Sequence, residues 1–236
     1  MTHVAHPYIQ RIGVNRDWRS RWFTTDPKTF REYLRVDAAL RAYLDKRLKG
    51  MSTDTVEIER SQKDIRIIIK TARPGLIIGR SGEGINKLKK DVDLFMRQQK
   101  VTKKPEIKLD IEEIRSPESS ARLVGQMIAE GLEKRLTFRR VMKQTIEKVM
   151  ANRDVEGVRI ILSGRLGGAD MARREELKKG QIPLQTLRAN IDFARVTARL
   201  PYGAIGIKVW IYRGEVFTDR KSGQQDTAPR ATANTK

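Results

Sequence analysis

The hydrophobic period of the chain changes repeatedly between residues 28 and 111, and this constrains the fold more than any other feature. Apolar residues recur every three to four positions over 28–49, alternate over 56–59 and 65–70, recur helically over 85–96, and alternate over 107–111. The longer period predicts a helix, and strict alternation predicts a strand. A short apolar segment and a glycine-rich loop separate the second strand from the second helix. The predicted order is therefore helix, strand, strand, short helix, loop, helix and strand.

The loop reads Gly79, Arg80, Ser81, Gly82, and its spacing decides between several binding folds. The dinucleotide fingerprint needs G-x-G-x-x-G after a strand, whereas this stretch reads G-x-x-G-x-G. A Walker sequence needs G-K-S/T after four spacer residues, and the chain has none. The pattern resembles the GXXG loop of a KH domain, where missing Cβ atoms let a nucleic-acid backbone approach. Arg80 and the N–H groups of the next helix would attract a phosphate, and a simple turn is the alternative.

A second α+β region is predicted to begin at Ser116, an N-cap residue followed by the first-turn proline Pro117. Helices are expected over about 117–132 and 138–149, strands over 157–164, 191–200 and 204–212, and a basic, loop-rich segment over 165–188. The fold class is α+β: a type II KH domain (α-β-β-α-α-β), then a second α+β domain of two helices packed on a small, mostly antiparallel sheet. The expected parts are an irregular basic and aromatic segment at 1–27, the KH domain at 28–115, the second domain at 116–217 and a disordered tail at 218–236.

The chain is strongly basic, which indicates the kind of partner it binds. Its 49 Lys and Arg oppose 29 Asp and Glu, for a formal charge of +20 and a pI near 10.4. Nucleic acid is the first candidate for a polyanionic partner, and an anionic membrane surface is the second. No apolar stretch approaches the roughly 20 residues of a membrane span, and the N-terminus lacks the apolar core of a signal peptide. We therefore expect a soluble, cytoplasmic protein with no membrane partner.

The residues that enzymes and metal sites need are scarce. Cysteine is absent, which excludes disulfides, thiolate zinc sites and cysteine nucleophiles. His3 and His6 are the only histidines and have no third ligand, so we expect no metal site, no cofactor and no small-molecule substrate. A nucleic-acid lyase that uses a lysine stays as an alternative, but the prediction is that the protein is not an enzyme.

Three groups of basic residues are candidates for RNA contact, with a solvated surface as the alternative for each. In the helix at 138–149, Arg139, Arg140 and Lys143 fall within an arc of about 100°. Residues 134–148 contain six basic residues and one acid, Glu147, so the like charges repel one another. A row of bound phosphates would offset this repulsion. The other two groups are Arg11, Arg16, Arg19 and Arg21 near the N-terminus, and Arg165, Arg173, Arg174, Lys178, Lys179 and Arg188 after the strand at 157–164.

Five ordered segments resemble the bacterial family of the third small-subunit ribosomal protein: TARPGLIIGRSGEGINKL, LEKRLTFRRVMK, SGRLGGADMAR, PLQTLRANIDF and YGAIGIKVWIYRGE. The resemblance covers the whole chain except the tail. It implies a structural, cytoplasmic role on the ribosome, with binding to small-subunit rRNA in the head and the tenth and fourteenth small-subunit proteins as neighbours. It also implies that Arg139, Arg140 and Lys143 line the channel through which mRNA enters, and assist the ribosome in unwinding structured message. The family loop is often doubly basic, whereas position 81 here is Ser.

Two rival functions remain beside the ribosomal one. A free KH regulator of RNA processing or message stability would not need the complete second domain. A nucleic-acid-cleaving enzyme would need a histidine or metal constellation, and the sequence offers none. Whether the GXXG loop holds rRNA or passing mRNA stays open, as do the rRNA helices contacted.

Overall fold

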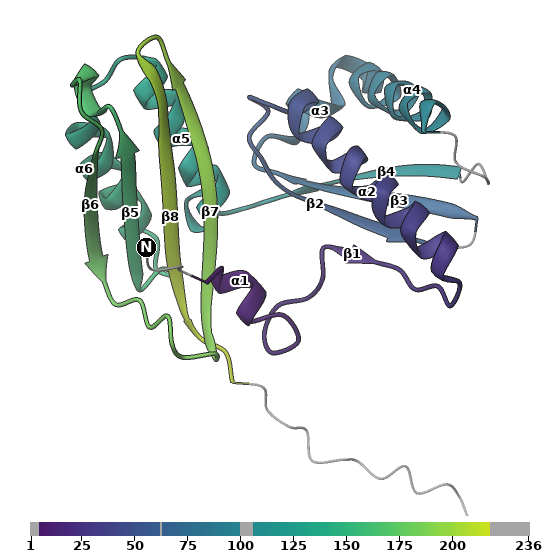
Figure 1. Ribbon diagram of the computed structural model, residues 1–236, viewed down its shortest axis with the longest axis horizontal. Coiled ribbons are helices and arrows are strands. Elements are labelled where there is room, and N and C mark those ends of the chain that lie inside the picture. The colour runs from purple at the N-terminus through teal and green to yellow at the C-terminus, as the bar shows by residue number, and fades with distance from the viewer. Residues whose placement is uncertain (1–4, 62, 100–105, 218–236) are drawn as a thin grey trace, which may run out of the picture.

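The computed structural model describes residues 5–61, 63–99 and 106–217, which form two α/β units side by side (Figure 1). The first unit runs from α2 to β4, and the second unit runs from α5 to β8. The predicted tail at 218–236 and His3 lie outside the described residues.

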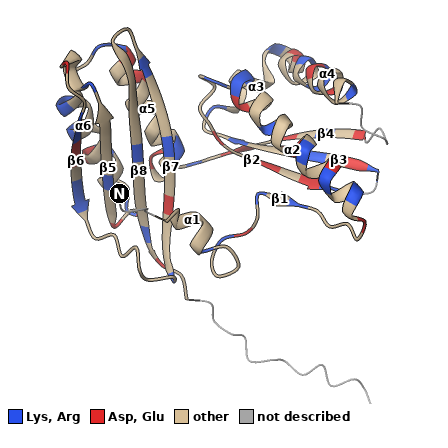
Figure 2. Ribbon diagram, viewed as in Figure 1, with Lys and Arg blue, Asp and Glu red and all other residues tan. Residues whose placement is uncertain are grey.

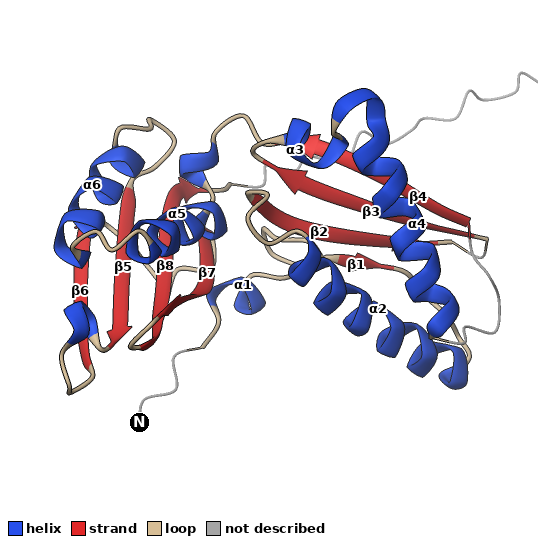
Figure 3. Ribbon diagram, turned by 90° about the horizontal axis from the view of Figure 1, so that it is seen from above, coloured by secondary structure: helices blue, strands red, loops and turns tan. Residues whose placement is uncertain are grey.

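The first unit has the predicted type II KH order. Its elements are α2 (Pro27–Arg47), β2 (Thr53–Arg60), β3 (Asp64–Thr71), α3 (Pro74–Ile78), α4 (Glu83–Gln98) and β4 (Glu106–Glu113). β2 pairs antiparallel with β3, and β3 pairs parallel with β4. α2 and α4 cover one face of this sheet (Figure 3), where they pack on alternate strand residues such as Ile58, Ile67 and Ile69. The alternation of apolar and polar residues in these strands thus corresponds to one buried face of the sheet, as predicted.

The second unit places two helices on an antiparallel sheet, which confirms the predicted fold class. Its elements are α5 (Ala121–Glu133), α6 (Phe138–Met150), β5 (Gly157–Gly164), β6 (Arg173–Gly180), β7 (Ala189–Leu200) and β8 (Gly203–Glu215). The strand order is β6-β5-β8-β7, and every neighbouring pair is antiparallel. α5 and α6 lie behind the sheet in Figure 1 and pack on residues such as Val158, Ile160 and Ile207. α5 and α6 do not cover the opposite face; there the short helix α1 (Pro7–Gln10) lies against β7, and the His6 ring is 4.8 Å from the ring of Phe193.

Strand β6 corrects the prediction that 165–188 is loop-rich. It lies at the edge of the sheet, and most of its residues are exposed. Its one large apolar residue, Leu177, packs against the core. An edge strand is held by backbone pairing to a single neighbour, so it can form without the apolar alternation that predicts a strand.

The start of α5 also differs from the prediction. Residues Pro117–Ser119 form a short 3₁₀ turn, and α5 begins at Ala121. Ser120, not Ser116, is the N-cap, since its Oγ accepts a hydrogen bond from Leu123 N at 3.4 Å. Two Ser residues can cap a helix here, and the local sequence does not rank them.

The N-terminal segment is less irregular than predicted, because it contains α1 (Pro7–Gln10) and β1 (Ser20–Arg21). β1 pairs parallel with β2 of the first unit, and α1 packs against β7 of the second. Arg41 of α2 holds the segment by donating to Ser20 Oγ at 2.7 Å. Elements this short have no period of their own and form through such tertiary contacts.

Candidate RNA-binding surfaces

The GXXG loop lies exposed between α3 and α4. Gly79 and Gly82 have φ values of +71° and +79°, in the left-handed region that glycine tolerates best. Ser81 is also left-handed, at +51°, and both Arg80 and Ser81 are exposed. No side chain caps the N-terminus of α4, so its first N–H groups can bind an anion. The loop has the geometry for backbone contact with a phosphate.

The next glycine, Gly84, has a different role. A Cβ atom there would lie 2.4 Å from Ile77 O and 2.8 Å from Ile78 O. Only glycine therefore allows the end of α3 to pack against the first turn of α4. Gly84 sets the shape of the loop from inside the protein, and the GXXG residues form its outer surface.

Helix α6 presents the three predicted cations on its exposed side. Arg139, Arg140 and Lys143 are all exposed, whereas Val141 and Met142 are buried. They lie in the first two turns, where the helix dipole is positive, and the first turn contains no acid. Among the described residues, Arg140 and Lys143 form no ion pair. This end of α6 is therefore a concentrated positive surface.

Arg173 of strand β6 lies beside the three cations of α6 and adds a fourth positive charge to this surface. Arg139 and Arg173 both lie over the ring of Phe138, with their Cζ atoms 5.6 and 5.5 Å from its centroid. Glu175 lies 3.9 Å from Arg139 and 3.5 Å from Arg173. The sequence suggested Arg173 as part of a separate group, but the structure places it beside Arg139.

The N-terminal arginines do not form the exposed group that was predicted. Arg11 is fully buried. Its guanidinium donates to four carbonyl oxygens, those of Pro7 at 2.9 Å, Leu184 at 3.0 Å, Thr186 at 3.0 Å and Ala189 at 2.7 Å. The prediction that Arg11 contacts RNA is wrong, because this side chain ties the N-terminal segment to the second unit.

The other three arginines of this segment contact the protein itself. Arg16 lies 3.9 Å from Asp192, and the Cζ of Arg19 lies 4.6 Å from the centroid of the Tyr8 ring. Arg21 pairs with Asp17, Glu57 and Glu59. Contact between these three residues and RNA stays a prediction, and the structure shows competing partners for each.

The basic residues of β6 divide between two faces, because successive side chains of a strand point in opposite directions. By register, Arg173 and Lys179 share the face that the helices cover, and Arg174 and Lys178 share the opposite, open face. The predicted group is therefore not a single surface.

Arg165 and Arg188, the remaining candidates, lie outside the strands. Arg165 donates to Ala169 O at 2.9 Å and to Tyr202 O at 3.2 Å, which fixes the turn after β5. Arg188 lies 3.8 Å from Glu215. Both have roles within the fold, and their contact with RNA stays a prediction.

Sequence reasoning missed four cations of the open face, Arg159, Arg195, Arg199 and Lys208. Each occupies an alternate position in a strand that was predicted, so the sequence did carry a signal. What it did not show is that these positions lie together on the face away from α5 and α6.

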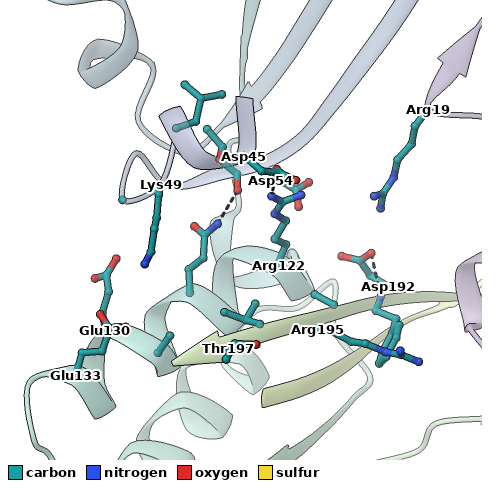
Figure 4. A pocket seen from close by; sticks show the side chains of 18 of the residues that line it. Arg19, Asp45, Lys49, Asp54, Arg122, Glu130, Glu133, Asp192, Arg195 and Thr197 are labelled. Atoms are coloured by element: carbon teal, nitrogen blue, oxygen red, sulfur yellow. Dashed lines mark hydrogen bonds and ion pairs between the residues drawn. The ribbon is translucent and has the colours of Figure 1, made fainter. Parts of the chain in front are cut away.

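A cavity of about 700 Å³ lies between the two units (Figure 4). Its charged lining is mixed: Asp45, Asp54, Glu130, Glu133 and Asp192 with Arg19, Lys49, Arg122 and Arg195. Burial raises the pKa of Asp54, and the nearby Asp192 carboxylate acts in the same direction. So many acids disfavour a phosphate, and we interpret the cavity as part of the junction between units.

The described residues offer little for other kinds of function. Nowhere in them do three or more potential ligand side chains gather into a metal site. None of the helices described has the length and apolar character to span a bilayer. A KH fold with an open glycine loop, beside a unit rich in exposed Arg and Lys, defines an RNA-binding protein.

Comparison with known proteins then identifies the family. The family described as KH domain matches residues 39–119, and the family described as ribosomal protein S3, C-terminal domain, matches residues 128–211. Small ribosomal subunit protein uS3 of Caldicellulosiruptor saccharolyticus is 44% identical over 220 residues, which cover 93% of this chain and 96% of that protein. The uS3 proteins of Alcanivorax borkumensis and Coxiella burnetii are 43% and 42% identical, over 96% and 98% of this chain and 94% and 98% of their own lengths.

The chain belongs to the ribosomal protein S3 family. It is a structural constituent of the small ribosomal subunit, it binds rRNA, and it is not an enzyme. Its place is on the ribosome in the cytoplasm.

Proposed function

We propose that α6 binds mRNA as the message enters the small subunit, through Arg139, Arg140 and Lys143. The observation that carries this proposal is the exposed positive end of α6. Among the described residues its three cations form one ion pair, between Arg139 and Glu175 at 3.9 Å. Arg173 extends the same surface across Phe138. Arginine forks suit phosphate, and single-stranded message presents one phosphate per nucleotide.

The proposed help with unwinding is passive. The sequence has no Walker pattern, the motif with which many NTPases bind the nucleotide that drives such work, so we assign this protein no driving role. Translocation supplies the work, and the cations hold the unpaired strand so that a hairpin does not re-form. Neutralising three phosphates of a single strand contributes roughly −2 to the slope of log affinity against log salt.

The test replaces Arg139, Arg140 and Lys143 together with Ala, which preserves the helix. Translation through a stable mRNA hairpin should slow several-fold, and translation of unstructured message should change little. The matched control removes three exposed cations of α2, Arg31, Arg35 and Lys46. Equal speeds of the triple variant and the natural protein on the hairpin template would overturn the proposal.

Arg173 allows a sharper version of this test, because Arg174 beside it points to the opposite face. Arg173→Ala should slow hairpin translation, and Arg174→Ala should not, when equal amounts of ribosomes carrying each variant are compared. If both variants behave alike, Arg173 does not belong to the mRNA surface.

We further propose that the GXXG loop binds an RNA backbone, supported by its left-handed glycines and the uncapped start of α4. Arg80→Ala combined with Ser81→Asp should weaken binding of the free protein to single-stranded RNA. Ser81→Lys, which restores a doubly basic loop, should strengthen it. Binding that is unchanged in both variants would exclude the loop as a contact.

The tenth and fourteenth small-subunit proteins are the proposed protein neighbours. Phe23, Phe30 and Leu34 are 88%, 47% and 55% exposed, and Phe30 and Leu34 are adjacent on α2. Exposed apolar side chains of this size suit a protein contact. Phe23→Glu should reduce cross-linking to these two proteins in assembled subunits, and an unchanged pattern would place their contact elsewhere.

A further inference from the structure

The open face of the second sheet is a cationic surface built from all four strands. By register, residues of β6, β5, β8 and β7 line up across it in rows. One row is Lys178, Arg159, Trp210 and Phe193, the next is Glu176, Ile161, Lys208 and Arg195, and the third is Arg174, Ser163, Gly206 and Thr197. With Arg199 of β7 beyond them, these rows contain six cations and one acid, Glu176. Figure 2 shows Lys and Arg positions along this sheet in blue. We call this set of residues the sheet platform.

Two pairs of like charges lie directly opposite each other on the platform. Arg159 is the cross-strand partner of Lys178, and Arg195 is the partner of Lys208. Like charges directly opposite in a sheet destabilise it. Glu176 relieves the first pair, since it lies 2.7 Å from Arg159. Among the described residues, Arg195 and Lys208 have no acidic partner.

The cations of the platform are also held over an apolar base. The Cζ of Arg159 lies 5.2 Å from the centroid of the Trp210 ring, and that of Arg195 lies 5.4 Å from the Phe193 ring. Trp210 and Phe193 are themselves buried. Cation–π contacts of this kind limit where the guanidinium groups can go. The positive charge of Arg159 and Arg195 is therefore displayed in a defined arrangement on the sheet.

We propose that the sheet platform binds the phosphate backbone of small-subunit rRNA. The repulsion between Arg195 and Lys208 is uncompensated within the described chain, and a polyanion laid across the strands would remove it. α6 belongs to the opposite face of the same sheet, so RNA on the platform is not the strand that contacts α6. The second unit would thus be fixed to rRNA by its sheet while its helix α6 faces the message.

The first experiment replaces Arg195 and Lys208 together with Ala. Purified small subunits carrying this variant should release it at lower salt than subunits with the natural protein. Loss of two phosphate contacts should also reduce the slope of log affinity against log salt by about 1.5. The free variant should be at least as stable to heat as the natural protein, because the repulsion is gone. The matched control is Arg35→Ala with Lys46→Ala on α2, which removes the same charge.

The outcomes separate this proposal from the proposed role of α6. Release at the same salt as the natural protein, or equal loss in the α2 control, would overturn it. A platform variant that melts at lower temperature would show a structural role instead. Ribosomes that retain the platform variant should translate through a hairpin at normal speed. The platform is tested by the salt at which the protein is released, so failure of the α6 proposal would not change that result.

The absence of cysteine allows a direct identification of the partner. Thr197→Cys places a single thiol on the platform next to Arg195, and a photoactivatable label on it should cross-link to rRNA in assembled subunits. Gln144→Cys on the exposed side of α6 serves as the control position. Cross-linking from position 197 to mRNA or to a ribosomal protein would overturn the proposal.

Discussion

Each of the two described sheets has one face that its long helices do not cover, and the charges on these two faces are arranged differently. The open face of the first sheet carries four cations, Arg21, Arg66, Lys70 and Lys108, and six acids, Glu57, Glu59, Asp64, Glu106, Asp110 and Glu112. Its cations are paired, for example Lys70 with Glu57 at 2.8 Å and Lys108 with Asp64 at 2.7 Å. The sheet platform of the second unit, by contrast, has six cations and one acid.

This difference shows that a formal charge of +20 is not spread evenly over the molecule. A face whose cations are neutralised by cross-strand acids gains stability and repels a polyanion. A face whose cations are opposite one another loses stability and attracts one. We therefore expect RNA-binding capacity to follow the pairing of cations and not their number.

The largest expected effect on stability is in the first unit, where a buried carboxylate is paired with a buried arginine. Asp37 is buried and accepts hydrogen bonds from Arg60 Nε at 3.0 Å and Trp22 Nε1 at 2.8 Å. Asp37→Ala would leave the Arg60 guanidinium buried without a counter-charge, so we expect a loss of about 3–5 kcal/mol in the free energy of unfolding. Urea denaturation measures this. Asp170→Ala, at an exposed pair with Arg165, is the control and should change nothing measurable.

Removing an acid from the first open face and adding one to the second should change the free energy of unfolding in opposite directions. Glu57 pairs with Arg21 and Lys70 on the first sheet, and Glu57→Gln should lower the free energy of unfolding by about 1 kcal/mol. Lys208→Glu replaces a like charge opposite Arg195 on the platform with an opposite one and should raise it by about 0.5 kcal/mol. Thermal melts of the free protein test both. Destabilisation by Lys208→Glu would contradict the comparison.

Replacing Asp54 at the junction between the two units tests whether an excess of acidic side chains there destabilises the folded protein. Burial and the Asp192 carboxylate raise the pKa of Asp54, while Ser120 Oγ, Arg122 and Arg19 act against them. A carboxyl group with a raised pKa in the folded state costs stability above that pKa, and this cost disappears below the pKa of the unfolded chain. Asp54→Asn should therefore raise the melting temperature at pH 7 by a few degrees, with the gain lost near pH 3. A gain that is independent of pH would indicate another cause.

The smallest effect is expected at Glu176, the one acid of the platform. Its hydrogen bond from Arg159 holds the pKa of Glu176 below the usual range. A lowered pKa contributes stability above the unfolded value, and that contribution is lost as pH falls through the folded one. Glu176→Gln should thus destabilise the protein by a fraction of 1 kcal/mol at pH 7, because the pair is partly exposed. The difference between variant and natural protein should begin to shrink as pH falls below the ordinary pKa of Glu, and vanish once Glu176 is protonated in the folded state as well.

Several features could be predicted from the sequence because they depend on local pattern. The hydrophobic periods predicted the KH order and most of the second unit, and the spacing of Gly79 and Gly82 predicted the loop. The exposed side of α6 followed from the angular positions of Arg139, Arg140 and Lys143. Strand β6 was missed because an exposed edge strand lacks apolar alternation.

The sequence by itself determined the order of elements, the basic character and the positions of the glycine loop and the cationic helix. Only the tertiary structure decided which cations remain available to a partner. Arg11 is buried among carbonyl oxygens, Arg21 is paired across strands, and Lys208 lies exposed opposite another cation. The physical reason is that charge pairing and burial depend on which strands become neighbours, and those neighbours are distant in the chain.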